Sequence, residues 1–171
     1  MKALLLAAIA TLARPAVAQS RPVWTFDHDE HGQAFLLFAD PEDGGEGDPP
    51  SITCGPRGQV TLESFVDGEH FPLHRAGPDS MVQLDAHGRR EPWQTQIRVS
   101  SGAVQALAPA RSEYGGEMNG TTLVKGYLPR TSPVYRAFAA SGRIRVVAYG
   151  QDAGLTPVPR RLLTRFVAAC R

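Results

Sequence analysis

The two cysteines, Cys54 and Cys170, are the side chains whose type and spacing point most clearly to a chemistry. In an oxidising compartment an even number of thiols forms disulfides by default. A redox-active pair is the alternative, but the chain has no C-x-x-C motif that would lower a thiol pKa. We therefore expect a structural Cys54–Cys170 disulfide, which the chain-entropy account values at about 4–5 kcal/mol for a loop of this length.

The N-terminus predicts the oxidising compartment. Lys2 gives a positive start, Ala3–Ala13 is apolar, and Pro15 precedes the cleavage-site pattern Ala16–Ala18. A bilayer span needs about 20 apolar residues, so this stretch is too short to span one. We expect residues 1–18 to be a cleaved signal peptide and residues 19–171 to be a single mature domain, periplasmic or secreted, in a bacterium. A buried N-terminal helix is the alternative.

Two groups of histidines could bind a metal. The segment Asp27–Gly32 begins like a calcium loop, but Phe38 stands at the twelfth position, where such a loop needs a glutamate. His28 and His31 supply two imidazoles without a third ligand. His70 and His74 have helical spacing, but a proline lies between them. We expect a hairpin turn and a solvated loop, respectively, with no metal or cofactor.

Other catalytic and binding patterns are weak. The chain has no G-x-S-x-G motif and, if the disulfide forms, no free cysteine, so we assign no catalytic residue. Aromatic side chains could line a ligand groove if they were exposed, although aromatics on strands more often belong to the core. These residues are Trp24, Trp93, Tyr114, Tyr127, Tyr135 and Tyr149.

The charge of the mature chain is close to neutral. Without Lys2 and Arg14, the 18 basic residues become 16 against 17 acidic ones, which gives a net charge of −1. Such a balance does not favour nucleic acid or an anionic membrane as a partner. Fifteen of the 16 basic residues are arginines, and Lys125 is the remaining one.

The elements that must position these residues are mostly short strands separated by turns. Runs rich in β-branched and aromatic residues, bounded by Gly, Pro and Asp, predict each of them. Ile52 and Cys54 share one face of their strand, so the Cys54 thiol should point into the core. The predicted strands cover residues 23–26, 34–38, 51–54, 59–66, 81–84, 93–99, 103–107, 121–127 and 143–149, with loops at 40–50 and 109–120.

Two helices complete the prediction. Ser132 is a typical N-cap, Pro133 follows at the first helical position, and Gly142 is a typical C-cap, so a short helix is expected near residues 133–140. Apolar residues from Val158 to Cys170 recur at helical spacing and predict an amphipathic C-terminal helix near 158–170. The fold class is therefore mainly β, an antiparallel β-sandwich or flattened barrel of about eight to ten strands.

Trp24 near the mature start, Ile52–Cys54 before a glycine turn, and the C-terminal layout closing on Phe166 and Cys170 carry a resemblance. They are similar to small exported bacterial β-sandwich proteins whose terminal helix is disulfide-linked to a strand. Type VI secretion accessory proteins and invasion-associated locus B proteins share this layout. The resemblance implies a fold and provides no catalytic residue.

The sequence favours a non-enzymatic binding or interaction protein. We expect a monomer that binds a protein of the bacterial envelope through an exposed sheet edge or an aromatic groove. An envelope hydrolase with an active site assembled from separate loops is the first alternative. Metal binding at the Asp27–His31 turn is the second.

Overall fold

The computed structural model describes residues 22–39, 50–55, 58–67, 73–77, 80–84, 87–90, 92–115 and 121–170. The predicted signal peptide and His70 lie outside these residues. The strands are β1 (Val23–His28), β2 (Ala34–Ala39), β3 (Ser51–Cys54), β4 (Gln59–Asp67), β5 (Leu73–Gly77), β6 (Ser80–Gln83), β7 (Trp93–Ser101), β8 (Val104–Tyr114), β9 (Thr121–Pro129), β10 (Arg145–Ala148) and β11 (Gln151–Gly154). The helices are α1 (Pro133–Ser141) and α2 (Arg160–Ala169).

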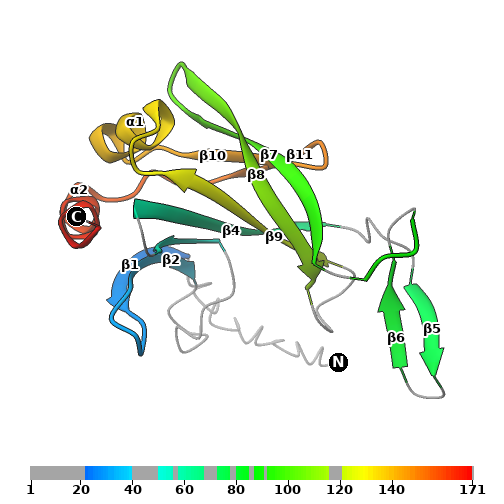
Figure 1. Ribbon diagram of the computed structural model, residues 1–171. Helices are drawn as coiled ribbons and strands as arrows, with labels where there is room; N and C mark the ends of the chain where they lie inside the picture. The colour runs from blue at the N-terminus through cyan, green and yellow to red at the C-terminus, as the bar shows by residue number, and fades with distance from the viewer. Residues whose placement is uncertain are drawn as a thin grey trace, which may run out of the picture.

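Nine of these strands form one antiparallel sheet in the order β1-β2-β3-β4-β9-β8-β7-β10-β11. The sheet curls into a half-barrel, and the separate hairpin of β5 and β6 projects away from it (Figure 1). Alternate residues of each strand point into the curve, as on β4, where every second residue from Val60 to Val66 is buried. The predicted mainly-β class is confirmed, in the form of a single curled sheet.

The two helices cover the inner face of the sheet at one end (Figure 1). Helix α1 contacts β7 and β8, and helix α2 contacts β1 and β2. Their apolar faces meet through Phe138 and Phe166, both fully buried, with ring centroids 6.4 Å apart. Both predicted helices are confirmed. The predicted caps of α1 are present, because the Ser132 hydroxyl accepts a hydrogen bond from the Tyr135 N–H and Gly142 has φ 71°.

Three parts of the predicted secondary structure were wrong. Strand β8 continues through residues 109–114, which the sequence predicted as a loop. Proline has no N–H to donate to a neighbouring strand. Pro109 is tolerated in β8 because β9 begins to pair with β8 only at Ala110, so no β9 carbonyl stands opposite Pro109. The predicted strand 143–149 is shorter and is followed by an unpredicted strand, β11. His74, predicted in a loop, lies on β5.

None of the helices in the described ranges is both long and apolar enough to cross a membrane.

Candidate functional site

The two edge strands of the large sheet, β1 and β11, differ in length and in the side-chain contacts around them. Strand β11 is held onto the end of β4 by the side chain of Gln151. The Asp67 N–H donates a hydrogen bond of 2.8 Å to Gln151 Oε1, and Gln151 Nε2 donates in return to the Asp67 carbonyl. The curled sheet is therefore partly closed at this edge.

An ion pair further protects β11. The guanidinium of Arg145 donates to Asp152 Oδ2 from both Nε and Nη2, at 2.8 and 2.6 Å. This hydrogen bond lowers the pKa of the Asp152 carboxyl below its ordinary value and raises the pKa of Arg145. A strand of four residues that carries the charge of Asp152 is a poor template for a further strand.

Among the described residues no strand pairs with the free side of β1, which we call its open edge, and the hydrogen-bond register shows which main-chain groups face it. The Asp29 N–H bonds to the Gln33 carbonyl at 3.0 Å, so these two residues are a hydrogen-bonded pair. The Phe38 N–H bonds in the opposite direction, to Pro50 beside β3. Antiparallel pairs alternate, so the main chain of Val23, Thr25 and Asp27 faces β2. The main-chain groups of Trp24, Phe26 and His28 therefore point outward from the sheet.

The outward groups of β1 have few partners in the described part of the chain. The His28 N–H donates to Asp27 Oδ1 at 2.8 Å. The N–H groups of Trp24 and Phe26 have no hydrogen bond to a main-chain or side-chain acceptor in those ranges. The side chain of Val23, on the outer face of the same strand, is 45% exposed. Two adjacent donor–acceptor positions are thus available for main-chain pairing.

Aromatic contacts fix the position of β1. The Trp24 indole N–H donates to the Thr156 carbonyl at 2.6 Å, and its ring lies 5.2 Å from that of Phe38. The Phe26 ring packs edge-on against His28 at 5.1 Å and lies under the guanidinium of Arg165 at 4.4 Å. An edge held rigidly in an extended conformation loses little entropy when a strand is added to it.

The predicted hairpin turn after β1, for which metal binding was the alternative, is stabilised by its own hydrogen bonds. Asp29 accepts hydrogen bonds from the main-chain N–H groups of His31 and Gln33, at 2.9 and 2.7 Å, and from the Gln33 side chain. The His31 imidazole pairs with Glu30 at 3.4 Å. Among the described residues no group of three or more His, Cys, Asp or Glu side chains is arranged to hold a metal ion. The observed role of Asp29 is to build the hairpin turn.

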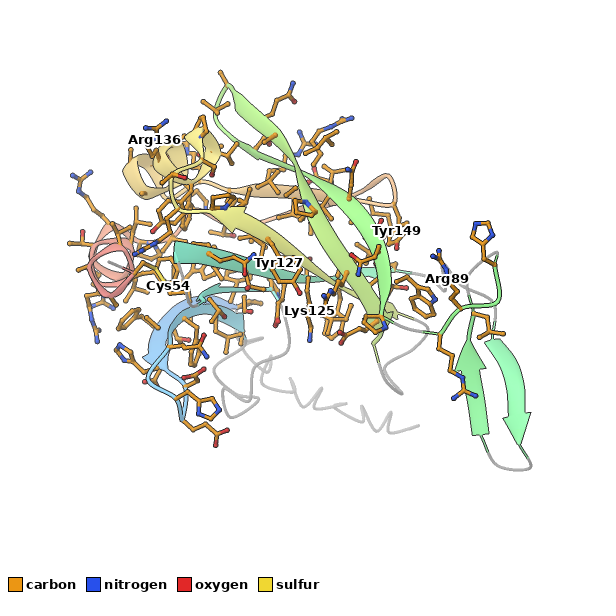
Figure 2. The ribbon with its side chains drawn as sticks, in the orientation of Figure 1. Cys54, Arg89, Lys125, Tyr127, Arg136 and Tyr149 are labelled. Atoms are coloured by element: carbon orange, nitrogen blue, oxygen red, sulfur yellow. A yellow bond between two sulfur atoms is a disulfide. The ribbon has the colours of Figure 1, made fainter. Side chains whose placement is uncertain are left out.

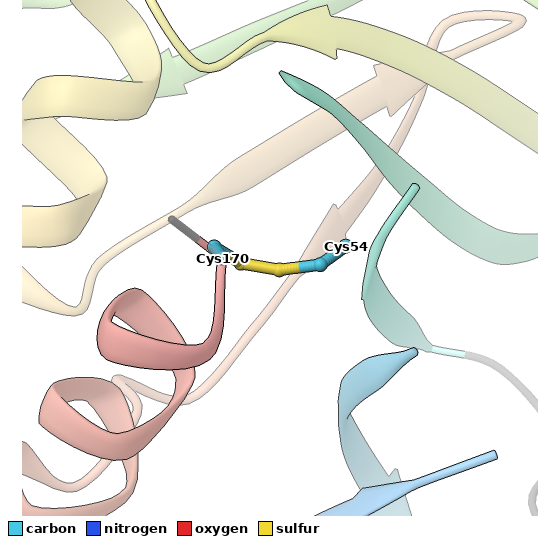
Figure 3. Close-up of a disulfide and its surroundings, with 2 residues drawn as sticks. All are labelled: Cys54 and Cys170. Atoms are coloured by element: carbon cyan, nitrogen blue, oxygen red, sulfur yellow. A yellow bond between two sulfur atoms is a disulfide. The ribbon is translucent and has the colours of Figure 1, made fainter. Parts of the chain in front are cut away.

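The predicted disulfide joins Cys54 at the end of β3 to Cys170 at the end of α2, with the Cα atoms 5.5 Å apart (Figure 3). Both cysteines are buried. An open cavity of about 590 Å³ lies beside the bond, and its polar lining includes Arg130 and His31. Gly58 makes room for Arg130, because a Cβ there would lie 3.1 Å from Nε of that guanidinium.

A cluster of charged side chains on the outer face of the sheet was not predicted from the sequence. Lys125 Nζ lies 3.2 Å from Glu113 Oε2 and 3.9 Å from Glu63 Oε1 (Figure 2). The three side chains come from β9, β8 and β4 and are half-buried. Strand alternation places each of them outward, but only the strand order, which the sequence does not give, brings them together. Such cross-strand pairs stabilise a sheet and do not by themselves perform chemistry.

The aromatic side chains are divided between core and surface. Trp24, Trp93 and Tyr135 are buried, as expected for aromatics in a sheet. Burial also raises the pKa of Tyr135, although the charge of Arg130 acts in the opposite direction. Tyr149 is half-buried, and its hydroxyl shares a 2.6 Å hydrogen bond with the buried Ser112. Tyr127 is half-buried on the outer face, and Tyr114 lies on β8.

Comparison with protein-family models, with curated proteins and with solved structures finds no match for this chain. The resemblance to exported β-sandwich proteins therefore stays a prediction.

Proposed function

We propose that this protein is an exported, non-enzymatic interaction protein that binds an extended segment of an envelope protein along the open edge of β1. The single observation that supports the proposal is the outward main chain of Trp24 and Phe26, free of hydrogen bonds to the described residues, on a strand that the fold holds rigid. Strand addition to such an edge provides main-chain hydrogen bonds without any catalytic group.

The contrast with β11 strengthens the proposal. Proteins usually block the edges of their sheets, because an unblocked edge pairs with other chains. Here β11 is short, bears one partner of the Arg145–Asp152 ion pair and is tied to the end of β4 by the Gln151 side chain. Strand β1 has six residues, no ion pair among the described residues and an exposed Val23. An edge left open on a chain that blocks its other edge is best explained by a partner that covers it.

The hydrolase alternative lacks a supporting constellation at the histidines of the β1–β2 turn. His28 contacts the Phe26 ring, and His31 pairs with Glu30. Neither imidazole has a hydrogen bond to a serine or threonine hydroxyl of the described residues. A general base needs such contact with the hydroxyl that it would activate.

Site-specific photo-crosslinking of the full chain in its native cells tests the proposal. A photoreactive residue in place of Val23 should give a crosslinked product of discrete mass. The matched control is the same residue in place of Arg98, which is exposed on β7 and has a paired strand on both sides, at Leu107 and Val147. The absence of a product at both positions, or an equal product at position 98, would overturn the proposal.

A further inference from the structure

The open cavity of about 590 Å³ beside the disulfide lies where the β1–β2 turn, the end of β3 and the end of α2 come together. Its volume is within the range of about 300–1,000 Å³ that is typical of small-molecule sites. The Cys54–Cys170 disulfide, shown in Figure 3, forms part of its wall. Because this bond ties the end of α2 to β3, two sides of the cavity are held together covalently.

The guanidinium of Arg130 lies at the wall of this cavity. Arg130 and Gly58 both line it, and a Cβ on Gly58 would lie 3.1 Å from both Nε and Nη2 of the guanidinium. Gly58 also has φ +74°, a conformation that residues with a side chain rarely adopt. The Arg130 N–H donates to the Gly58 carbonyl at 2.8 Å. Gly58 therefore provides both the space and the main-chain anchor that place the charged group at the cavity.

The positive charge of Arg130 has no counter-charge in the described part of the chain. No carboxylate there lies within ion-pair distance of its guanidinium, whereas Lys125 and Arg145 are each paired with an acidic side chain. Arg130 is also half-buried. A charge that is partly removed from water gains from an ionic partner, because burial takes away part of its hydration. A negatively charged ligand would provide that partner.

Two further polar side chains at the cavity have partners on their own turn. Gln33 Nε2 donates to Asp29 Oδ2 at 3.1 Å, and His31 Nε2 lies 3.4 Å from Glu30 Oε1. The rest of the wall consists of glycines, alanines and the disulfide. Arg130 is thus the side chain best placed to orient a ligand, and the remaining wall suits a small apolar body.

The end of α2 limits the charge that the ligand can carry. Ala169, the last residue of the helix, lines the cavity, and the last helical turn contains no basic residue. A helix carries about half of a negative charge at its C-terminus, so about half of the positive charge of Arg130 stays uncompensated. This balance attracts a group with one negative charge and disfavours a group with two.

We propose that the cavity is a binding site for a carboxylate group on a small apolar body. The planar guanidinium of Arg130 donates two parallel hydrogen bonds to the carboxylate oxygens. The apolar body then lies against the alanines and the disulfide. A free organic acid and the C-terminal residue of a peptide both present such a group. The site is separate from the open edge of β1 and does not depend on strand pairing there.

Titration of the disulfide-bonded protein with matched probes, followed by NMR, tests the inference. The probes are benzoate and butyrate, their neutral amides benzamide and butyramide, and inorganic phosphate. The signals are those of the Gly58 amide and the Arg130 Nε–H. Both should shift with the carboxylates and stay in place with the amides. Phosphate should bind more weakly than the carboxylates, because it carries more than one negative charge at pH values above 7.

An N-acetylated dialanine with a free C-terminus distinguishes the two sources of the carboxylate, and the same peptide with an amidated C-terminus is its control. Tighter binding of the free peptide than of butyrate assigns the site to a chain terminus. Weaker binding assigns it to a free organic acid. Equal binding of the free and the amidated peptide would contradict recognition of the carboxylate.

Variants of Arg130 test which group binds the carboxylate. Arg130→Gln should raise the dissociation constant for benzoate about tenfold, because a charge-assisted pair of hydrogen bonds is lost. Arg130→Lys keeps the charge without the planar fork and should have an intermediate effect. The control Arg136→Gln removes an exposed arginine from α1 (Figure 2) and should leave the dissociation constant unchanged.

Filling the cavity provides a test that leaves the charge of Arg130 in place. Ala169→Phe adds a large side chain at a lining position, and the control Ala168→Phe adds it at the preceding position, outside the lining. Both positions are exposed on α2, so both variants should fold. Ala169→Phe alone should weaken binding of benzoate.

The inference is overturned if neither carboxylate shifts the Gly58 amide, or if the neutral amides or phosphate bind as tightly as the carboxylates. An unchanged dissociation constant in Arg130→Gln, or equal effects of the two phenylalanine variants, also overturns it. None of these results bears on crosslinking at Val23, so the two proposals fail or stand separately.

Discussion

The two edges of the large sheet, β1 and β11, end the same sheet in different ways. Strand β11 has four residues, an ion pair and a glutamine that binds the main chain of β4. Strand β1 has six residues, and its outward main chain at Trp24 and Phe26 has no hydrogen-bond partner among the described residues. The difference lies in strand length, charge and contact with β4 and not in rigidity, because aromatic contacts hold β1 in place.

This difference indicates that an edge can be both well packed and open. Trp24 is buried and contacts Phe38, while α2 packs against the inner face of β1. These contacts involve side chains, and the outward main chain of Trp24 and Phe26 has no hydrogen-bond partner in the described ranges. A partner strand would therefore meet a surface that needs no rearrangement, which favours binding because little ordering is required.

The disulfide should have the largest effect on the comparison, because it ties α2 to β3 beside the β1 edge. Replacing both cysteines (C54S/C170S) removes a crosslink between residues 116 positions apart. We expect the free energy of unfolding to fall by about 4–5 kcal/mol. Urea denaturation of the wild-type protein and the variant measures this change in the free energy of unfolding. Amide exchange should rise more in β1 and α2 than in β10 and β11.

A reductant provides the control for this prediction. It should destabilise the unaltered protein by a similar amount and leave the double variant unaffected. A loss below about 1 kcal/mol, within the range of ordinary surface substitutions, would show that packing alone holds α2 against β1.

The sequence predicts the disulfide and α2 well, because both rest on local periodicity. Ile52 and Cys54 alternate on one strand face, and the apolar stripe of α2 continues to Cys170, so both thiols point to one core. Capping residues likewise predicted α1, where Ser132 and Gly142 take the expected roles. These features depend on neighbours within a few residues of each other.

The open edge of β1 and the contact of Arg165 with Phe26 could not be predicted from the sequence. Which strand is at an edge depends on the order of strands, and β4 pairs with β9 across more than fifty residues. Strand β11 was missed because its hairpin turn uses Tyr149 at φ 50°, where glycine or asparagine is the usual signal. The contact of Arg165 with Phe26 joins distant segments of the chain.

Opening the protected edge should have a smaller effect. The substitution Gln151→Ala removes both hydrogen bonds to Asp67. The free energy of unfolding should fall by about 1 kcal/mol or less for each hydrogen bond, because both bonds are exposed to solvent. The exchange of the Asp67 amide should become much faster. Gln96→Ala, at an exposed position of β7, is the matched control. Unchanged Asp67 exchange would contradict the role given to Gln151.

The smallest effect should come from the ion pair of β11. Because the hydrogen bond from Arg145 lowers the pKa of Asp152 in the folded protein, the pair stabilises the fold at pH values above the ordinary aspartate pKa of about 3.9. That contribution is lost as the pH falls through the lower, folded-state pKa. Solvent exposure keeps it small. An NMR titration of the Asp152 carboxyl measures the pKa directly.

The variant Arg145→Gln should return the pKa of Asp152 to its ordinary range and remove the associated pH dependence of stability. Amide exchange in β10 and β11 should then increase, while exchange at Trp24 and Phe26 stays unchanged, because the ion pair and β1 lie at opposite ends of the strand order. An equal change at both edges would mean that the ion pair stabilises the whole sheet. The Arg145–Asp152 ion pair would then not explain why the β1 and β11 edges differ.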